Sequence, residues 1–96
     1  MSRYRVQYSP AAYEDLRAIY RYIAWELQAE ATAQNQTARI RRAVRTLDNF
    51  PRRHPTLDWE PWMSMGLRKM PVDNYYVFYR VDEDRATVTI LRIFYA

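Results

Sequence analysis

The apolar residues of this 96-residue chain repeat with two different periods, and the change between them falls near Gly66. Upstream, apolar side chains recur every three or four positions, the spacing of one face of an amphipathic helix. Downstream, the segments are rich in β-branched and aromatic residues, which is typical of strands. A chain with this change of period is expected to fold as an α+β protein, with helices packed on one face of a sheet.

Two helices are predicted upstream of the change. Ser9 followed by Pro10 is typical of a helix start, with a capping hydroxyl and a proline in the first turn. A polar, alanine-rich stretch at 28–32 interrupts the first apolar stripe, and a second stripe resumes at Ala33. The pattern predicts an αα-hairpin over Pro10–Leu47. The two stripes consist of Tyr13, Leu16, Tyr20, Ile23 and Leu27, then Ala33, Thr37, Ile40, Val44 and Leu47.

Four strands are predicted around this hairpin. Arg3–Tyr8 alternates polar and apolar residues, and the later strands are Gly66–Val72, Tyr75–Val81 and Ala86–Tyr95. Because short turns join antiparallel neighbours, the last three strands are expected to form an antiparallel meander. We therefore expect a three- or four-stranded antiparallel sheet, with the hairpin on one face and the other face open to solvent or a ligand.

The segment between the hairpin and the meander has no steady period. Residues 51–65 contain prolines at 51, 55 and 61, so this segment is predicted to be a loop with one helical turn. The core is expected to form where the hairpin meets the sheet. Its predicted members are Val6, Leu16, Ile19, Ile23, Ile40, Val44, Leu47, Val77, Tyr79, Val88 and Ile90.

The composition indicates one domain over residues 1–96 that folds without a covalent cross-link. The length allows a single core, and 49% of the residues are hydrophobic. The absence of cysteine excludes disulfides and thiolate metal sites. No apolar run is long enough to span a membrane, and the N-terminus has no hydrophobic signal segment. We expect a cytoplasmic protein that uses neither a metal nor a cofactor.

The charge favours an anionic partner. The formal net charge is +4, and of the fifteen basic residues only Lys69 is a lysine. Arginine binds phosphates and carboxylates through two parallel hydrogen bonds, although a codon bias toward arginine explains the ratio equally well. The positive sign itself indicates nucleic acid, a ribosome or an acidic protein as the partner.

Three stretches of the sequence carry a family resemblance. In order and spacing they resemble the RelE/ParE toxins of bacterial type II toxin–antitoxin (plasmid stabilisation) systems, and the long, regular hairpin is more similar to ParE-like members. The resemblance covers essentially the whole chain and implies the RelE/ParE toxin fold. The stretches are Tyr4-x-Val6-x-Tyr8-Ser9-Pro10-Ala11-Ala12 continuing through Asp15-Leu16 to Ile23, then Ile40–Leu47 with Phe50-Pro51, and Leu67-Arg68-Lys69-Met70-Pro71 with Asn74–Val81 and Ile90–Ile93.

The resemblance implies two alternative activities, because ParE-like members poison DNA gyrase whereas RelE- and YoeB-like members cleave mRNA in the ribosomal A site. The leading hypothesis is a growth-inhibiting toxin that binds gyrase and is neutralised by an acidic cognate antitoxin, with a heterotetramer as the expected complex. The second is a metal-free, ribosome-dependent endoribonuclease. The third is an inactive relative that only binds its antitoxin.

The ribonuclease hypothesis assigns roles to four residues. Arg68 and Lys69 would clamp the scissile phosphate, although neighbouring strand residues point to opposite faces, so at most one lies on the open face unless a bulge intervenes. Glu60, in a Glu-Pro pair similar to that of YoeB-like enzymes, would be the base, and Tyr95 an auxiliary proton donor. Tyr76 stands where ribonuclease relatives carry an arginine, and the C-terminal end lacks their basic residues, which disfavours this hypothesis.

The remaining candidates are binding residues. Arg80 and Arg92 interrupt apolar strands, which indicates a functional face, and with Arg68 and Lys69 they form the predicted target- or nucleic-acid-binding set. Trp59 and Trp62 either cap the core edge or form an exposed anchor for bases or a partner. His54 matches no catalytic histidine of the family. The predicted antitoxin-binding set is Arg39, Arg42, Arg45, Arg68 and Arg92, with Arg41 in the same helical row.

Overall fold

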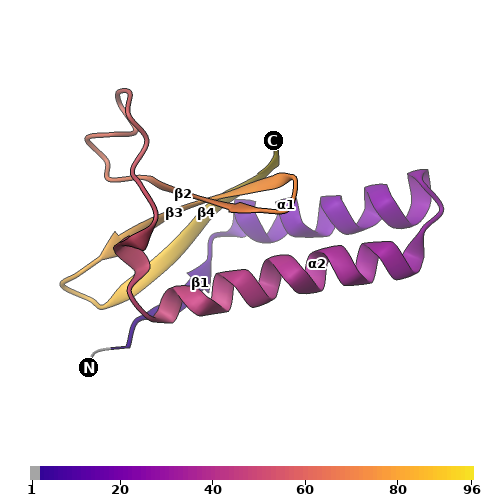
Figure 1. The fold of residues 1–96 in the computed structure, drawn as a ribbon, viewed down its shortest axis with the longest axis horizontal. Coiled ribbons are helices and arrows are strands. Elements are labelled where there is room, and N and C mark those ends of the chain that lie inside the picture. The colour runs from indigo at the N-terminus through magenta and orange to yellow at the C-terminus, as the bar shows by residue number, and fades with distance from the viewer. Residues whose placement is uncertain (1–2) are drawn as a thin grey trace.

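The computed structural model describes residues 3–96, and its element order is the one expected for an α+β domain (Figure 1). A first strand leads into two antiparallel helices, and three strands follow after a projecting loop. The strands are β1 (Arg5–Tyr8), β2 (Arg68–Val72), β3 (Tyr75–Asp82) and β4 (Thr87–Tyr95). The helices are α1 (Pro10–Arg21) and α2 (Glu30–Arg45), with a π-helical turn at Tyr22–Glu26 and 3₁₀ turns at Thr46–Asp48 and Pro51–Arg53.

The predicted meander is confirmed, but the sheet is mixed rather than wholly antiparallel. The strand order is β1-β4-β3-β2, and β2, β3 and β4 pair antiparallel in sequence. The prediction of an antiparallel first strand is wrong, because β1 runs parallel to β4, with Val6 opposite Val88. Alternation of polar and apolar residues specifies which side chains face the core, not the direction of pairing.

The first helix of the hairpin begins where the sequence predicts, and the second helix begins earlier than predicted. The Ser9 hydroxyl accepts a hydrogen bond from the Ala12 amide at 3.0 Å, the expected N-cap. The break between the helices is short and centres on Gln28, whose φ of 52° is left-handed. The second helix starts at Glu30 instead of near Ala33, because the alanine-rich stretch favours helix. Figure 1 shows that the far ends of both helices extend beyond the sheet.

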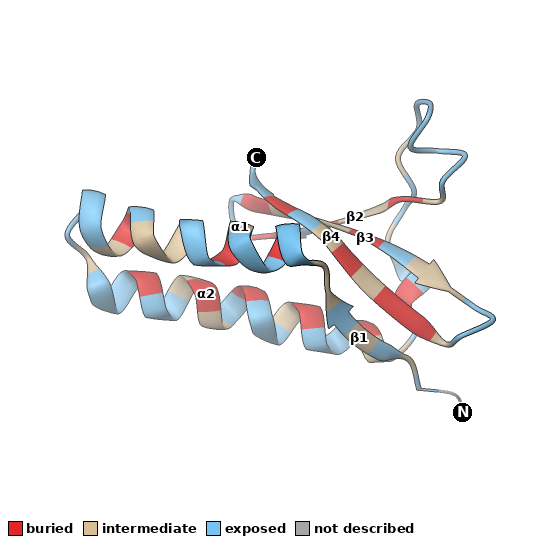
Figure 2. Cartoon of the chain, turned by 180° about the vertical axis from the view of Figure 1, so that it is seen from behind, coloured by how far each residue is buried: buried red, intermediate tan, exposed pale blue. Residues whose placement is uncertain are grey.

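The hydrophobic core lies between the hairpin and one face of the sheet, as the stripes of buried residues in Figure 2 show. Nine of the eleven predicted core residues are buried: Leu16, Ile23, Ile40, Val44, Leu47, Val77, Tyr79, Val88 and Ile90. Val6 and Ile19 are only partly buried, because they lie at the rim of the same cluster. Met70, Val72, Tyr75 and Ile93 complete the sheet's side of the core.

The loop between α2 and β2 projects away from the sheet, opposite the hairpin (Figure 1). One 3₁₀ turn opens it, as predicted, and backbone hydrogen bonds between Leu57 and Leu67 (2.9 Å) and between Lys69 and Pro55 (3.2 Å) close its base. The Tyr79 hydroxyl donates to the Pro51 carbonyl at 2.5 Å, which ties the loop to the core. Within residues 3–96 no helix is long and apolar enough to cross a membrane.

Candidate functional site

The face of the sheet opposite the hairpin carries the first candidate site. Since paired residues of antiparallel strands share a face, the register assigns Lys69, Phe78 and Arg92 to this side and Tyr79 to the core. A bulge beside Phe78 inserts one extra residue into β4 between Ile90 and Arg92. As a result the extra residue, Leu91, also lines the open face.

A groove of about 400 Å³ lies on this open face and is lined mainly by apolar side chains. The projecting loop forms one wall of it, with Trp59 66% and Trp62 41% exposed. Two cations lie over aromatic rings of the groove, with 4.5 Å from each cationic group to the ring centroid: Lys69 over Tyr76 and Arg92 over Phe94. We call this site the open-face groove; it is lined by Leu57, Trp59, Trp62, Leu67, Lys69, Tyr76, Phe78, Leu91, Arg92 and Phe94.

The two tryptophans do not cap the core edge, which was one of the two interpretations of the sequence. Both side chains are exposed and line the open-face groove, as the second interpretation requires, and their role as an anchor stays a prediction. Sequence reasoning could not choose between the interpretations, because the loop has no periodicity that relates Trp59 or Trp62 to a buried face.

Arg92 is engaged by a carboxylate from α1. Its guanidinium forms two hydrogen bonds to Asp15, of 2.7 and 2.9 Å, and Asp15 also accepts the Ile93 amide at 3.0 Å. Partial burial opposes ionisation of Asp15, but the hydrogen bonds from Arg92 and Ile93 outweigh it and hold the pKa of Asp15 below its ordinary value. Asp15 therefore caps the part of the β4 edge that β1 does not cover.

Arg68 points to the other side of β2 from Lys69. It pairs with the core residue Tyr79 in the register, and its guanidinium donates to the carbonyls of Arg52 (3.2 Å) and His54 (2.7 Å). Only Lys69 of the two neighbouring cations lies on the open face, as strand geometry requires. Arg68 fastens the base of the projecting loop.

The structure does not bring all four residues of the predicted ribonuclease set to one face, because Arg68 and Lys69, neighbours in β2, point to opposite sides of the sheet. The Glu60 carboxylate, in the loop, accepts the Ser64 amide at 3.1 Å. Tyr95 is 71% exposed and packs edge-on against Tyr75, at the opposite end of β3 from the Arg68 pairing. Lys69 alone lines the open-face groove. Arg80 is exposed on the same face of β3 as Phe78.

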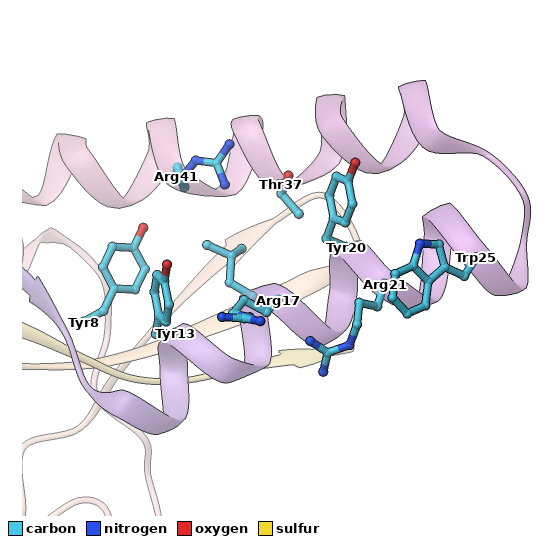
Figure 3. A pocket seen from close by; sticks show the side chains of 9 residues that line it. Tyr8, Tyr13, Arg17, Tyr20, Arg21, Trp25, Thr37 and Arg41 are labelled. Atoms are coloured by element: carbon cyan, nitrogen blue, oxygen red, sulfur yellow. The ribbon is translucent and has the colours of Figure 1, made fainter.

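A second groove, of about 460 Å³, runs between α1 and α2 on the outside of the hairpin (Figure 3). Burial raises the pKa of the Tyr8 phenol in this groove, and the nearby guanidinium groups of Arg41 and Arg45 oppose that rise. Sequence reasoning missed this site, although the tyrosines within the first apolar stripe and the arginines beside that stripe were its signal. We call it the hairpin groove; it is lined by Tyr8, Tyr13, Leu16, Arg17, Tyr20, Arg21, Trp25, Thr37 and Arg41.

The arginines of α2 do not form one row. At about 3.6 residues per turn, Arg41 and Arg45 lie on the flank toward the hairpin groove, whereas Arg42 points directly away from the buried stripe. Arg39 lies on the other flank, where it pairs with Asp73 at 2.8 Å. Within residues 3–96, Arg41, Arg42 and Arg45 have no ion-pair partner.

The surroundings of His54 indicate a structural role for this residue. The ring is half-buried and meets Tyr79 edge-on, with 6.4 Å between ring centroids. Burial and the charge of Arg53 both lower the pKa of His54, which favours the neutral form of the ring. Among the described residues no group of three or more histidine, aspartate or glutamate side chains is arranged to hold a metal ion.

Comparison with solved structures identifies the class of fold. The chain is similar to a protein of the chromosomal ParDE toxin–antitoxin system of P. aeruginosa, with a TM-score of 0.79, 22% identity and coverage of 97% and 96% of the two chains. It is also similar to a protein from the RelBE2 toxin–antitoxin complex of Mycobacterium tuberculosis, with a TM-score of 0.71, 24% identity and coverage of 100% and 94% of the two chains. A third similar structure is from the archaeal RelE–RelB complex of Pyrococcus horikoshii OT3, with a TM-score of 0.63, 16% identity and coverage of 96% and 93% of the two chains. The protein therefore has the RelE/ParE toxin fold.

The family follows from the sequence. Residues 6–96 match the family model of the ParE toxin of the type II toxin–antitoxin system parDE. The chain belongs to this ParE toxin family. No curated protein matches the sequence significantly.

Proposed function

We propose that the protein is a growth-inhibiting toxin that acts by binding DNA gyrase and is neutralised by an acidic cognate antitoxin. The observation that carries the proposal is the ParE match over residues 6–96, nearly the whole domain. The resemblance to ParE-like toxins supports gyrase as the target. The same fold also occurs in the RelE–RelB complex, so the fold alone does not determine the target.

The side-chain arrangement supports binding in preference to RNA cleavage. Phosphoryl transfer without a metal needs a base, a cation and a proton donor around one scissile phosphate. Here the Arg68 guanidinium is occupied by the carbonyls of Arg52 and His54, and Tyr95 packs beside Tyr75 at the far end of β3. Of the cations on the open face, Arg92 is already paired with Asp15.

The experiment that tests the target compares two processes after induction. We expect replication to stop, with an SOS response, while protein synthesis continues. With purified components, the protein is expected to inhibit DNA supercoiling by gyrase and to leave ribosome-bound mRNA intact in primer extension. Ribosome-stimulated cleavage without any effect on gyrase would contradict the proposal.

The hairpin groove is the surface that best fits the proposed antitoxin. It combines aromatic walls with three arginines, of which Arg41 is unpaired among residues 3–96. Arg45, which does not line the groove but lies near Tyr8, is unpaired as well. An extended acidic segment would pair its carboxylates with these guanidinium groups and place apolar side chains between the rings. Arg39 and Arg92 could join only by leaving Asp73 and Asp15.

The antitoxin surface is tested with the product of the neighbouring gene. Charge reversal at both Arg41 and Arg45, to Glu, is expected to weaken binding about tenfold or more and to reduce its salt dependence. Arg85→Glu, in the β3–β4 turn, is the matched control because Arg85 is exposed and outside both grooves. The mass of the complex in solution tests the expected heterotetramer. Unchanged binding by the double variant would contradict this assignment.

A further inference from the structure

We infer that the open-face groove is the surface that engages the toxin's target, and that it takes a protein segment with an apolar anchor next to a carboxylate. This inference rests on the proposed function. It adds a second surface, because the antitoxin is assigned to the hairpin groove. The two surfaces lie on opposite sides of the sheet, since alternate residues of β3 face the hairpin and the open-face groove.

The groove is apolar enough to require an apolar occupant. Three large aromatic side chains that line it remain substantially exposed: Trp59 at 66%, Phe94 at 43% and Trp62 at 41%. Exposed aromatic patches of this kind, enclosing a concave volume, are typical of protein-binding sites and not of inert surface. A volume of about 400 Å³ accommodates one or two large apolar side chains.

The ring geometry favours a protein segment over single-stranded nucleic acid. Bases bind by stacking on flat ring faces that are free and presented in series. Here Phe78 lies tilted between its neighbours, at 53° to Tyr76 and 59° to Phe94. Cations already occupy one face of Tyr76 and one face of Phe94. These rings form a rough apolar floor that suits aliphatic or aromatic side chains.

The charges around the groove define the polar part of the occupant. No carboxylate lines the groove, and its two cations are Lys69 and Arg92. Arg92 pairs with Asp15, so of these two groove cations Lys69 is the one that has no ion-pair partner among residues 3–96. Arg80 adds a second exposed positive charge on the same face of β3. A single carboxylate beside the apolar anchor complements this pattern, whereas a polyphosphate backbone needs several unpaired cations.

The test uses the full chain with two variants that leave the core intact. In one, Trp59→Ala is combined with Phe94→Ser; in the other, Lys69 is replaced by Glu. The matched controls are Phe50→Ala, since Phe50 is 74% exposed and lies outside both grooves, and Arg85→Glu. Each protein is measured for growth arrest, for binding to purified DNA gyrase, to the purified antitoxin and to a single-stranded RNA 12-mer, and for its melting temperature.

We expect both groove variants to lose growth arrest and to bind gyrase about tenfold more weakly or worse, while antitoxin affinity and melting temperature stay unchanged. The controls should behave like the wild type. If a groove variant that melts normally lost antitoxin binding as well as growth arrest, the assignment of two separate surfaces would be overturned. Tight, variant-sensitive binding of the RNA 12-mer would show that the occupant is nucleic acid and overturn the inference.

The design separates this inference from the proposed function. If the wild type arrests growth and binds gyrase but the groove variants do so equally well, the inference is wrong and the proposed function stands. If the wild type arrests growth without binding gyrase, the proposed target is wrong. In that case the inference is retained only if the groove variants lose growth arrest, and it is overturned if they keep it.

Discussion

Strand β3 carries large apolar side chains on both of its faces, yet the chain covers only one of them. Tyr75, Val77 and Tyr79 face the hairpin and are buried, with Val77 and Tyr79 at 0% exposure. Phe78 and Tyr76, between them, face the opposite side, where the nearest covering element is the projecting loop with its two tryptophans. The two faces have similar composition but differ in what packs on them.

The covered side of the sheet forms the core, and the open side is the one that we propose for a partner. On the covered face, helices α1 and α2 supply apolar side chains that interdigitate with those of the sheet. On the open face, aromatic rings contact cations and one another and still line an open groove. Stability is therefore expected to depend on the first face and activity on the second.

The largest effect is expected from shortening a side chain on the covered face. Tyr79→Ala should lower the free energy of unfolding by about 3–5 kcal/mol, because it leaves a cavity in a fully buried site. It also removes the hydrogen bond from the Tyr79 hydroxyl to the Pro51 carbonyl. Chemical denaturation, read by circular dichroism, measures the change.

Tyr79→Phe separates the ring from the hydroxyl in the same position. It keeps the packing and leaves the Pro51 carbonyl without this donor, so it should cost about 1 kcal/mol. If Tyr79→Ala cost no more than Tyr79→Phe, the ring would contribute little to the core. The contrast between the two faces would then be wrong.

An intermediate effect is expected at the rim, where the two faces meet along the edge of β4. Asp15→Ala removes two hydrogen bonds donated by Arg92 and one donated by the Ile93 amide, and should cost about 1–2 kcal/mol at pH 7, since Arg92 is partly exposed. Because the folded-state pKa of Asp15 is lowered, this stabilisation is present above the ordinary carboxyl pKa. It is lost as the pH falls from about 4 through the folded-state value.

The pH dependence supplies the control for Asp15. The difference in unfolding free energy between wild type and Asp15→Ala should shrink on acidification. Asp15→Asn should resemble Asp15→Ala in lacking the pH-dependent stabilisation. A difference that stays constant from pH 7 to pH 2.5 would show that Asp15 acts through packing alone. The conclusion that the Asp15 carboxylate caps the β4 edge would then be wrong.

The covered face was predictable from the sequence because its signals are local and periodic. Helical spacing identified Leu16, Ile40 and Val44, and strand alternation identified Val77 and Val88, all of which are buried. The turn chemistry at Ser9 also located the start of α1. The direction of β1 was not predictable, because alternation is the same for a parallel and an antiparallel neighbour.

The open face was harder to predict because its chemistry depends on contacts between distant segments. The partner of Arg92 is Asp15, 77 residues away, and no spacing rule connects them. Arg68 was predicted as a phosphate clamp, but its guanidinium lies against backbone carbonyls that only the folded loop brings near. The predicted phosphate-clamp and binding roles of Lys69 remain predictions, although strand geometry correctly separated its direction from that of Arg68.

The smallest effect on stability is expected on the open face itself, in the projecting loop. Trp59→Ser should change the free energy of unfolding by no more than about 0.5 kcal/mol, because the side chain is 66% exposed and lines the groove instead of the core. The same substitution should reduce binding of an apolar fluorescent dye to the folded protein, whereas Phe50→Ser, outside both grooves, should reduce it less.

If Trp59→Ser instead cost about 2 kcal/mol or more, the loop would be held on the sheet as a second covering layer. The open face would then be part of the core rather than a surface available to a partner, and the contrast between the two faces of β3 would no longer hold.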